Sequence, residues 1–137
     1  MNTILTHALL VLGAVALLAG CANEPASMED QLSGTWRLTG IFDQDQDVTA
    51  EHNPSNNRWI NLKPDGSFES DGDPYGRNTG KWSWDATEKL LHLDSDAGEE
   101  DDSYWSVEIK EKEMSWRGAK FEFSKRFRLT YARGVPA

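Results

Sequence analysis

Two histidines and many carboxylates are the groups after residue 21 that could transfer protons or hold a metal ion. His52 and His92 stand forty residues apart, and neither belongs to an H-E-x-x-H motif or a nucleophile elbow. A three-histidine zinc site is therefore excluded in this part of the chain, and the only cysteine precedes it. We expect no enzymatic activity, no cofactor and no metal.

The acidic segments offer one alternative, a calcium site. Asp43, Asp45 and Asp47 alternate as ligands do at the start of a calcium loop, but an EF-hand needs Gly at the sixth position and Glu at the twelfth. The sequence has Val48 and Pro54 there, so the segment is not an EF-hand. Two interpretations remain, an irregular calcium site and a solvated loop. Residues 94–102 hold six acids, which predicts a self-repelling loop at one rim of the fold.

Aromatic side chains are the strongest candidates for binding an apolar ligand. The chain has six tryptophans, and those of inward parity on their predicted strands are Trp36, Trp82, Trp84, Trp105 and Trp116. The lumen of an eight-stranded barrel is either filled by side chains or holds one small ligand. A filled core and a partly open apolar cup both remain possible, and the cup residues would be Trp82, Trp84, Trp105 and Trp116. Trp59, Tyr75 and Tyr104 are candidates for surface contacts.

The elements that must position these side chains are short strands. Apolar and polar residues alternate in brief runs separated by turn residues such as Pro64-Asp65-Gly66, and no long stretch has helical period. Strands with short connections are antiparallel, and eight of them avoid exposed edges by closing into an up-and-down barrel. The fold class is therefore all-β, with a two-layer β-sandwich as the alternative. The predicted strands are Gly34–Phe42, Arg58–Lys63, Ser67–Ser70, Thr79–Trp84, Lys89–Asp94, Ser103–Lys110, Glu113–Arg117 and Lys120–Ala132, the last with a bulge or break at Lys125.

The amino-terminal segment is typical of an export signal. Residues 8–19 form an apolar run too short to span a membrane, and Leu18-Ala19-Gly20-Cys21 resembles the lipobox of bacterial lipoproteins. The resemblance implies that residues 1–20 are removed and that Cys21 receives acyl chains such as palmitate, which anchor the protein in a membrane. In a host with two membranes it implies the outer membrane, facing the periplasm. We expect residues 21–31 to be the lipidated cysteine and a tether, and residues 32–137 to form the domain.

An ordered set of motifs resembles small bacterial lipocalin-like domains over residues 32–133. The set comprises Gly34-Thr35-Trp36-Arg37-Leu38, Pro64-Asp65-Gly66-Ser67-Phe68, Gly80-Lys81-Trp82-Ser83-Trp84 and Leu91-His92-Leu93. In lipocalins the tryptophan of the first strand packs at the closed end of the barrel beneath an arginine from near the last strand. The resemblance makes Gly34 and Trp36 structural signature residues, with Arg128 as the arginine partner and Arg126 and Arg133 as alternatives.

Charge divides the chain unequally and limits its partners. Residues 22–109 carry 6 basic and 20 acidic side chains, whereas residues 110–137 carry 8 basic and 3 acidic ones, for a net −9. This balance argues against a nucleic-acid partner. A basic last strand would contact anionic lipid or an acidic partner, or neutralise acidic neighbours.

The function expected from the sequence is non-enzymatic. It is a cell-envelope lipoprotein whose lipocalin-like domain binds a small hydrophobic ligand or an envelope partner. One alternative is a periplasmic inhibitor, because small barrels with a Gly-x-Trp start resemble bacterial metalloprotease inhibitors, although their cysteine pair is absent here. The other is a structural or stress-sensing lipoprotein without a ligand.

Overall fold

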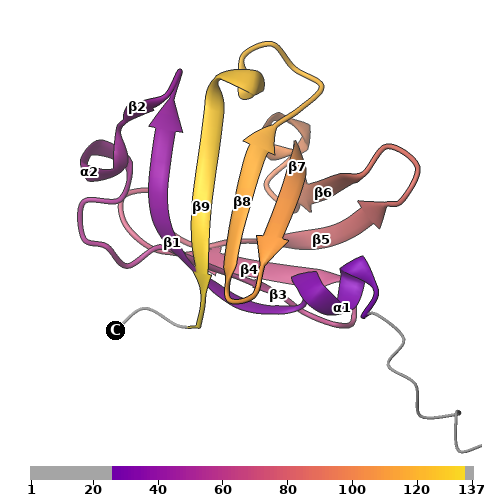
Figure 1. Cartoon of the computed structure of the whole chain (residues 1–137). Helices are drawn as coiled ribbons and strands as arrows, with labels where there is room; N and C mark the ends of the chain where they lie inside the picture. Colours follow the sequence, from indigo (N-terminus) through magenta and orange to yellow (C-terminus); the bar gives the residue numbers. More distant parts are fainter. Residues whose placement is uncertain (1–25, 135–137) are drawn as a thin grey trace, which may run out of the picture.

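The computed structural model describes residues 26–134, and these form a closed antiparallel β-barrel (Figure 1). The two segments outside this range include the predicted signal and Cys21. Eight strands make the barrel wall, and a short strand, β2 (Gln46–Asp47), pairs with the end of β1 at one rim. The wall strands are β1 (Gly34–Asp43), β3 (Trp59–Leu62), β4 (Ser67–Asp71), β5 (Asn78–Asp85), β6 (Leu90–Ser95), β7 (Ser103–Lys110), β8 (Glu113–Gly118) and β9 (Phe127–Arg133).

Pairing of the first and last strands closes the barrel. β1 pairs with β9 from Trp36 opposite Arg133 to Asp43 opposite Phe127, and each intervening strand pairs with the next one. This continuous ladder confirms the predicted barrel and rules out the two-sheet sandwich. A register shift between Leu38 and Gly40 bends β1, so that both Leu38 and Ile41 are buried.

The turn between β3 and β4 forms as the sequence predicts. Gly66, with φ of 88°, occupies the left-handed position between β3 and β4, and the Asp65 carboxylate accepts hydrogen bonds from the backbone and side chain of Ser67. These two hydrogen bonds hold the pKa of Asp65 below its usual value. Local sequence therefore determines this turn.

The start of the last strand was predicted wrongly. β9 begins at Phe127, and residues 119–126 form a loop that includes a single turn of 3₁₀ helix, η3 (Ser124–Arg126). Phe121 and Phe123, which lie within the predicted strand Lys120–Ala132, are 54% and 68% exposed. The loop folds back over β8 and comes so close to Gly118 that a Cβ at this position would overlap the carbonyl oxygen of Ser124. Lys125 therefore lies in a break before the strand.

Two short helices were also missed. α1 (Met28–Leu32) occupies part of the segment expected to be a tether, with Ser27 accepting a hydrogen bond from the Asp30 backbone as its N-cap. α2 (Thr49–His52) follows β2. Another 3₁₀ turn, η2 (Glu99–Asp101), lies in the acidic loop. Between residues 26 and 134, no helix has the length and apolar character needed to cross a membrane.

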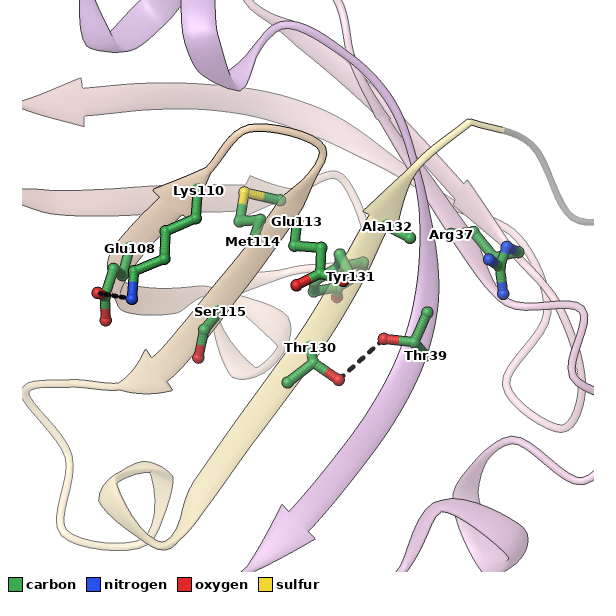
Figure 2. A pocket seen from close by; sticks show the side chains of 10 residues that line it. All are labelled: Arg37, Thr39, Glu108, Lys110, Glu113, Met114, Ser115, Thr130, Tyr131 and Ala132. Atoms are coloured by element: carbon green, nitrogen blue, oxygen red, sulfur yellow. Dashed lines mark hydrogen bonds and ion pairs between the residues drawn. The ribbon is translucent and has the colours of Figure 1, made fainter.

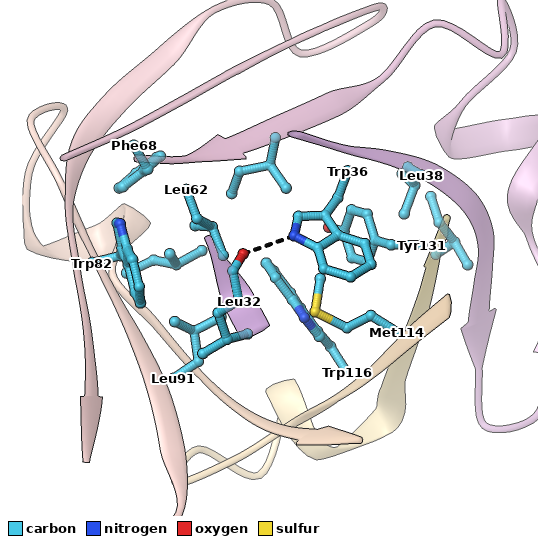
Figure 3. Close-up of a cluster of buried hydrophobic side chains, with 13 residues drawn as sticks. Leu32, Trp36, Leu38, Leu62, Phe68, Trp82, Leu91, Met114, Trp116 and Tyr131 are labelled. Carbon is cyan, nitrogen blue, oxygen red and sulfur yellow. Dashed lines mark hydrogen bonds between the residues drawn. The ribbon is translucent and has the colours of Figure 1, made fainter. Parts of the chain in front are cut away.

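α1 lies at one end of the barrel (Figure 1), and buried side chains pack around its Leu32 (Figure 3). Leu32 of α1 is fully buried among side chains from the barrel wall, and its carbonyl oxygen accepts a hydrogen bond of 2.8 Å from Trp36 Nε1. We refer to this end of the barrel as the closed end. From there the buried cluster continues along the barrel interior to the cavity at the opposite end, and it also contains Leu38, Ile60, Leu62, Phe68, Trp82, Leu91, Leu93, Met114, Trp116 and Tyr131.

Arg133 is the arginine that stacks on Trp36. Its guanidinium carbon lies 3.9 Å from the ring centroid of Trp36, and its Nη atoms donate hydrogen bonds to the carbonyl oxygens of Ser33 and Gln31 at 2.5 and 2.8 Å. Arg128, the expected partner, instead stacks on Phe42 at 4.1 Å. The reason is register: Trp36 pairs with Arg133, whereas Arg128 pairs with Phe42 at the other rim of the barrel.

Candidate functional site

A cavity of about 450 Å³ opens at the end of the barrel opposite α1. The loops at this end join β1 to β3, β4 to β5, β6 to β7 and β8 to β9. The inner wall of the cavity is apolar and largely aromatic. Its apolar lining residues are Leu38, Trp59, Ile60, Phe68, Leu93, Ala97, Trp105, Trp116, Leu129 and Tyr131.

The structure brings two of the four predicted cup tryptophans together at this cavity. The rings of Trp105 and Trp116 lie 5.6 Å apart between centroids, and Trp116 also contacts Tyr131 at 4.6 Å. Trp105 donates a hydrogen bond from Nε1 to the Ser103 hydroxyl, whereas the buried Nε1 of Trp116 has no partner among the described residues. A buried N–H without an acceptor is unusual in a folded protein.

Trp82 and Trp84 lie elsewhere. Trp82 is buried at the closed end, where its Nε1 donates a hydrogen bond to the carbonyl oxygen of Lys63. Trp82 and Trp84 border a shallow hollow beside Glu29 and Asp30 of α1. Neither residue lines the cavity at the open end. Inward parity predicts which face of the sheet a side chain is on, but it does not predict which end of the barrel the side chain lies at. Trp82 and Trp84 lie at the closed end.

Polar side chains surround the mouth of the cavity. They come from the chain before β3, from the loops between β4 and β5 and between β6 and β7, and from the ends of β4, β5 and β7 that adjoin these loops. The polar and charged lining residues are Arg58, Ser70, Asp71, Tyr75, Arg77, Asn78, Asp101 and Ser103. The site is therefore an apolar cup with a charged rim.

The Arg58 side chain is held in place at this rim by two contacts, which a third interaction joins. Its Nη1 donates a hydrogen bond of 2.9 Å to the carbonyl oxygen of His52, and its guanidinium carbon lies 4.9 Å from the ring centroid of Tyr75. The Tyr75 hydroxyl in turn is 2.6 Å from Nδ1 of His52. Gly72, with φ of 122°, lets the loop approach the Arg58 backbone so closely that a Cβ would overlap it.

Tyr131 is the buried titratable group of the lining. Burial raises the pKa of its phenol above the ordinary value, and the positive charge of Arg58 acts in the opposite direction. Tyr131 is therefore a neutral hydroxyl at physiological pH.

A second hollow, of about 540 Å³, lies on the outer face of strands β1, β7, β8 and β9 (Figure 2). Four of its polar side chains already pair with one another. Lys110 forms a 3.7 Å ion pair with Glu108, and the hydroxyls of Thr39 and Thr130 are 2.9 Å apart. Although this hollow is larger, we place the site in the cup, because the cup is the more enclosed of the two and aromatic side chains line it.

Carboxylates of the acidic segments accept hydrogen bonds from other parts of the barrel and from their own loops. Asp43 accepts hydrogen bonds of 3.0 and 2.8 Å from Arg126, and Asp47 accepts from the backbone and hydroxyl of Thr49, which lowers the pKa of Asp47. Asp102 accepts from the Ser95 backbone. Within residues 26–134, no group of three or more His, Cys, Asp or Glu side chains is arranged to hold a metal ion.

Sequence reasoning missed Arg58 and the role of its loop partners. Arg58 was assigned only as the first residue of a predicted strand, and Tyr75 only as a candidate for surface contacts. The available signal was that Arg58 is one of six basic side chains among residues 22–109. Its position at the cavity depends on the packing of α2 and of the loop between β4 and β5.

Comparisons with known proteins find a similar fold but no matching family. No protein-family model matches the chain, and no curated protein matches it. A solved structure, a DUF4847 family protein from Bacteroides vulgatus, is similar with a TM-score of 0.56 and 11% identity, over 77% of this chain and 95% of that chain. At this identity the likeness concerns architecture: the two chains share a fold.

Proposed function

We propose that this protein is a non-enzymatic, lipid-anchored protein of the cell envelope whose barrel holds a small apolar ligand. The observation that carries the proposal is the aromatic-lined cavity at one end of a barrel whose other end is filled. The sequence resemblance to lipocalin-like domains supports the same assignment.

The size and lining of the cavity support a small ligand. Small-molecule sites typically occupy about 300–1,000 Å³, and the cavity volume of about 450 Å³ falls in the lower part of that range. Burial of apolar ligand surface against Trp105 and Leu129 would contribute about 25 cal/mol per Å². A ligand could bury this surface without separation of the barrel strands, because the cavity is open at the end of the barrel.

The proposed anchor rests on the lipobox-like residues that end at Cys21. Acylation there would hold the domain at a membrane, in a two-membrane host at the periplasmic face of the outer membrane. Labelled palmitate should enter the protein, and Cys21→Ala should move it from the membrane fraction to the soluble fraction. Unchanged fractionation of that variant would remove the anchor from the proposal.

A matched pair of variants tests the cup. Leu129→Trp places a larger side chain in the cavity lining, whereas Ser106→Trp places the same side chain at an exposed position of β7. Native mass spectrometry of protein purified from its host should detect a small molecule with the wild type and with Ser106→Trp, and little with Leu129→Trp. If wild-type protein carries no small molecule and its tryptophan fluorescence is unchanged by a panel of lipids, the binding function is wrong.

A further inference from the structure

The rim of the cup suggests what kind of ligand it accepts. We infer that the cavity selects an amphiphile with an anionic head group, a carboxylate or a phosphate monoester, and that Arg58 is the residue that pairs with this head. The inference rests on the proposed function and adds the chemical class of the ligand.

Arg58 has most of its hydrogen-bonding capacity free. A guanidinium carries five N–H donors in a planar fork, and one of those of Arg58 reaches the carbonyl oxygen of His52. Among residues 26–134, Arg58 forms no ion pair with a carboxylate at 4.0 Å or less. The side chain is half-buried and lines the cavity.

Other arginines of the barrel have different surroundings. Arg77, at the same mouth, donates from Nε to Glu69 at 3.0 Å, and Arg126 pairs with both carboxylate oxygens of Asp43. Arg133 is bound to two carbonyl oxygens and to Trp36 at the closed end. Arg58 therefore differs from Arg77 in having no protein carboxylate while facing the same cavity.

The contacts of Arg58 fix its direction. Stacking against Tyr75 and the hydrogen bond to His52 hold the side chain at the rim, and the hydrogen bond between Tyr75 and His52 joins the two supports. A prepositioned fork loses little conformational entropy when it binds a planar carboxylate in bidentate fashion. The apolar chain of such a ligand would then extend toward Trp105 and Leu129.

The two carboxylates that line the cavity, those of Asp71 and Asp101, do not make it selective for a cationic ligand. Asp71 and Asp101 are exposed, and Asp71 already accepts a hydrogen bond from the Gly72 backbone. Charges in contact with water are screened, whereas a half-buried cation is screened less. The charge that a ligand meets at the cavity wall is therefore that of Arg58.

A series of decyl compounds tests the inference with the full mature protein. The probes are decanoate, decyl phosphate, decanol and decyltrimethylammonium, each titrated below its micelle concentration while intrinsic tryptophan fluorescence is recorded. The variants are Arg58→Met, which removes the charge at similar length, and Arg77→Met as the matched control at the same mouth. Urea unfolding establishes that both variants are folded.

Wild-type protein should bind the anionic probes about tenfold to a hundredfold more tightly than decanol, as expected for charge-assisted hydrogen bonds. Arg58→Met should abolish that difference, and Arg77→Met should keep most of it. The tighter of decanoate and decyl phosphate identifies the head group.

Three results would overturn the inference. If all four probes bind equally, or if Arg58→Met leaves the preference unchanged, the assigned role of Arg58 is wrong while the proposed cup remains. Preferential binding of decyltrimethylammonium would reverse the sign of the selected charge. Absence of binding by every probe would reject the anionic-amphiphile inference and count against the proposed function itself.

Discussion

The two ends of the barrel use the same kinds of side chain in different ways. At the closed end Leu32 and Trp36 are completely buried, and the indole N–H groups of Trp36 and Trp82 donate to carbonyl oxygens. At the open end Trp105 is half-buried beside a cavity, and Trp116 Nε1 has no partner among residues 26–134. The difference arises because α1 fills the closed end, whereas loops surround the mouth of the open end.

This contrast separates stability from binding. A filled and hydrogen-bonded end contributes packing and burial, which stabilise the folded barrel. An incompletely filled end contributes less to the free energy of unfolding and leaves apolar surface for a ligand. Substitutions at the two ends should therefore have different effects on unfolding and on ligand binding.

The largest expected effect on stability is at the closed end. Trp36→Ala should lower the free energy of unfolding by about 3–5 kcal/mol, because it leaves a cavity where a buried indole was packed. Trp105→Ala, at the open end, should cost less, about 1–2 kcal/mol, since its ring is half-buried. Urea unfolding of both variants measures the difference. Equal losses would contradict the distinction between the ends.

Arginines at the two ends allow a smaller comparison. Arg133→Met should lower the free energy of unfolding by about 1–3 kcal/mol, since it removes the stack on Trp36 and two hydrogen bonds to carbonyl oxygens. Arg128→Met removes only the stack on Phe42 and should cost about 0.5–1 kcal/mol. Thermal melts of the pair check this order, and a greater loss for Arg128→Met would restore Arg128 as the signature residue.

Alkaline pH should reveal the burial of Tyr131. Its folded pKa is raised above 10, the value in an unfolded chain, so the folded state keeps a proton that the unfolded state releases. Stability from this group is complete below pH 10 and is lost as the pH rises above 10. Urea midpoints measured across this range should fall more steeply for wild-type protein than for Tyr131→Phe. Parallel curves would show that Tyr131 is accessible to water.

The smallest effect is expected in the loop before β9. Phe121→Ser and Phe123→Ser should each change the free energy of unfolding by less than about 0.5 kcal/mol, because both rings are more than half exposed. Phe127→Ser is the comparison within β9, where the ring is half-buried and should cost more. A large loss from Phe123→Ser would mean that the loop packs as a strand after all.

Much of the barrel follows from local sequence. Alternation predicted seven of the eight wall strands closely, and the turn at Asp65 and Gly66 has the conformation that these residues favour. The eighth began too early because Phe121 and Phe123 continue the alternating pattern of the strand. Gly118 allows the chain to fold back at this point, and alternation does not encode that contact.

The site was less predictable because it depends on contacts between distant segments. Parity indicated that five tryptophans point inward, and two of them, Trp105 and Trp116, line the cavity. The division between Trp82 and Trp105 depends on which end α1 fills, and α1 lies in a segment whose polar composition indicated a tether. Arg58, His52 and Tyr75 meet only through the packing of α2 and a loop.

The most direct test of an open cup opposite a filled end is an NMR titration of the indole N–H signals with decanoate. We expect shifts for Trp105 and Trp116, which line the cavity, and unchanged signals for Trp36 and Trp82, which are hydrogen-bonded at the closed end. Shifts at Trp36 and Trp82 without shifts at Trp105 and Trp116, or no shift at any indole, would contradict this expectation.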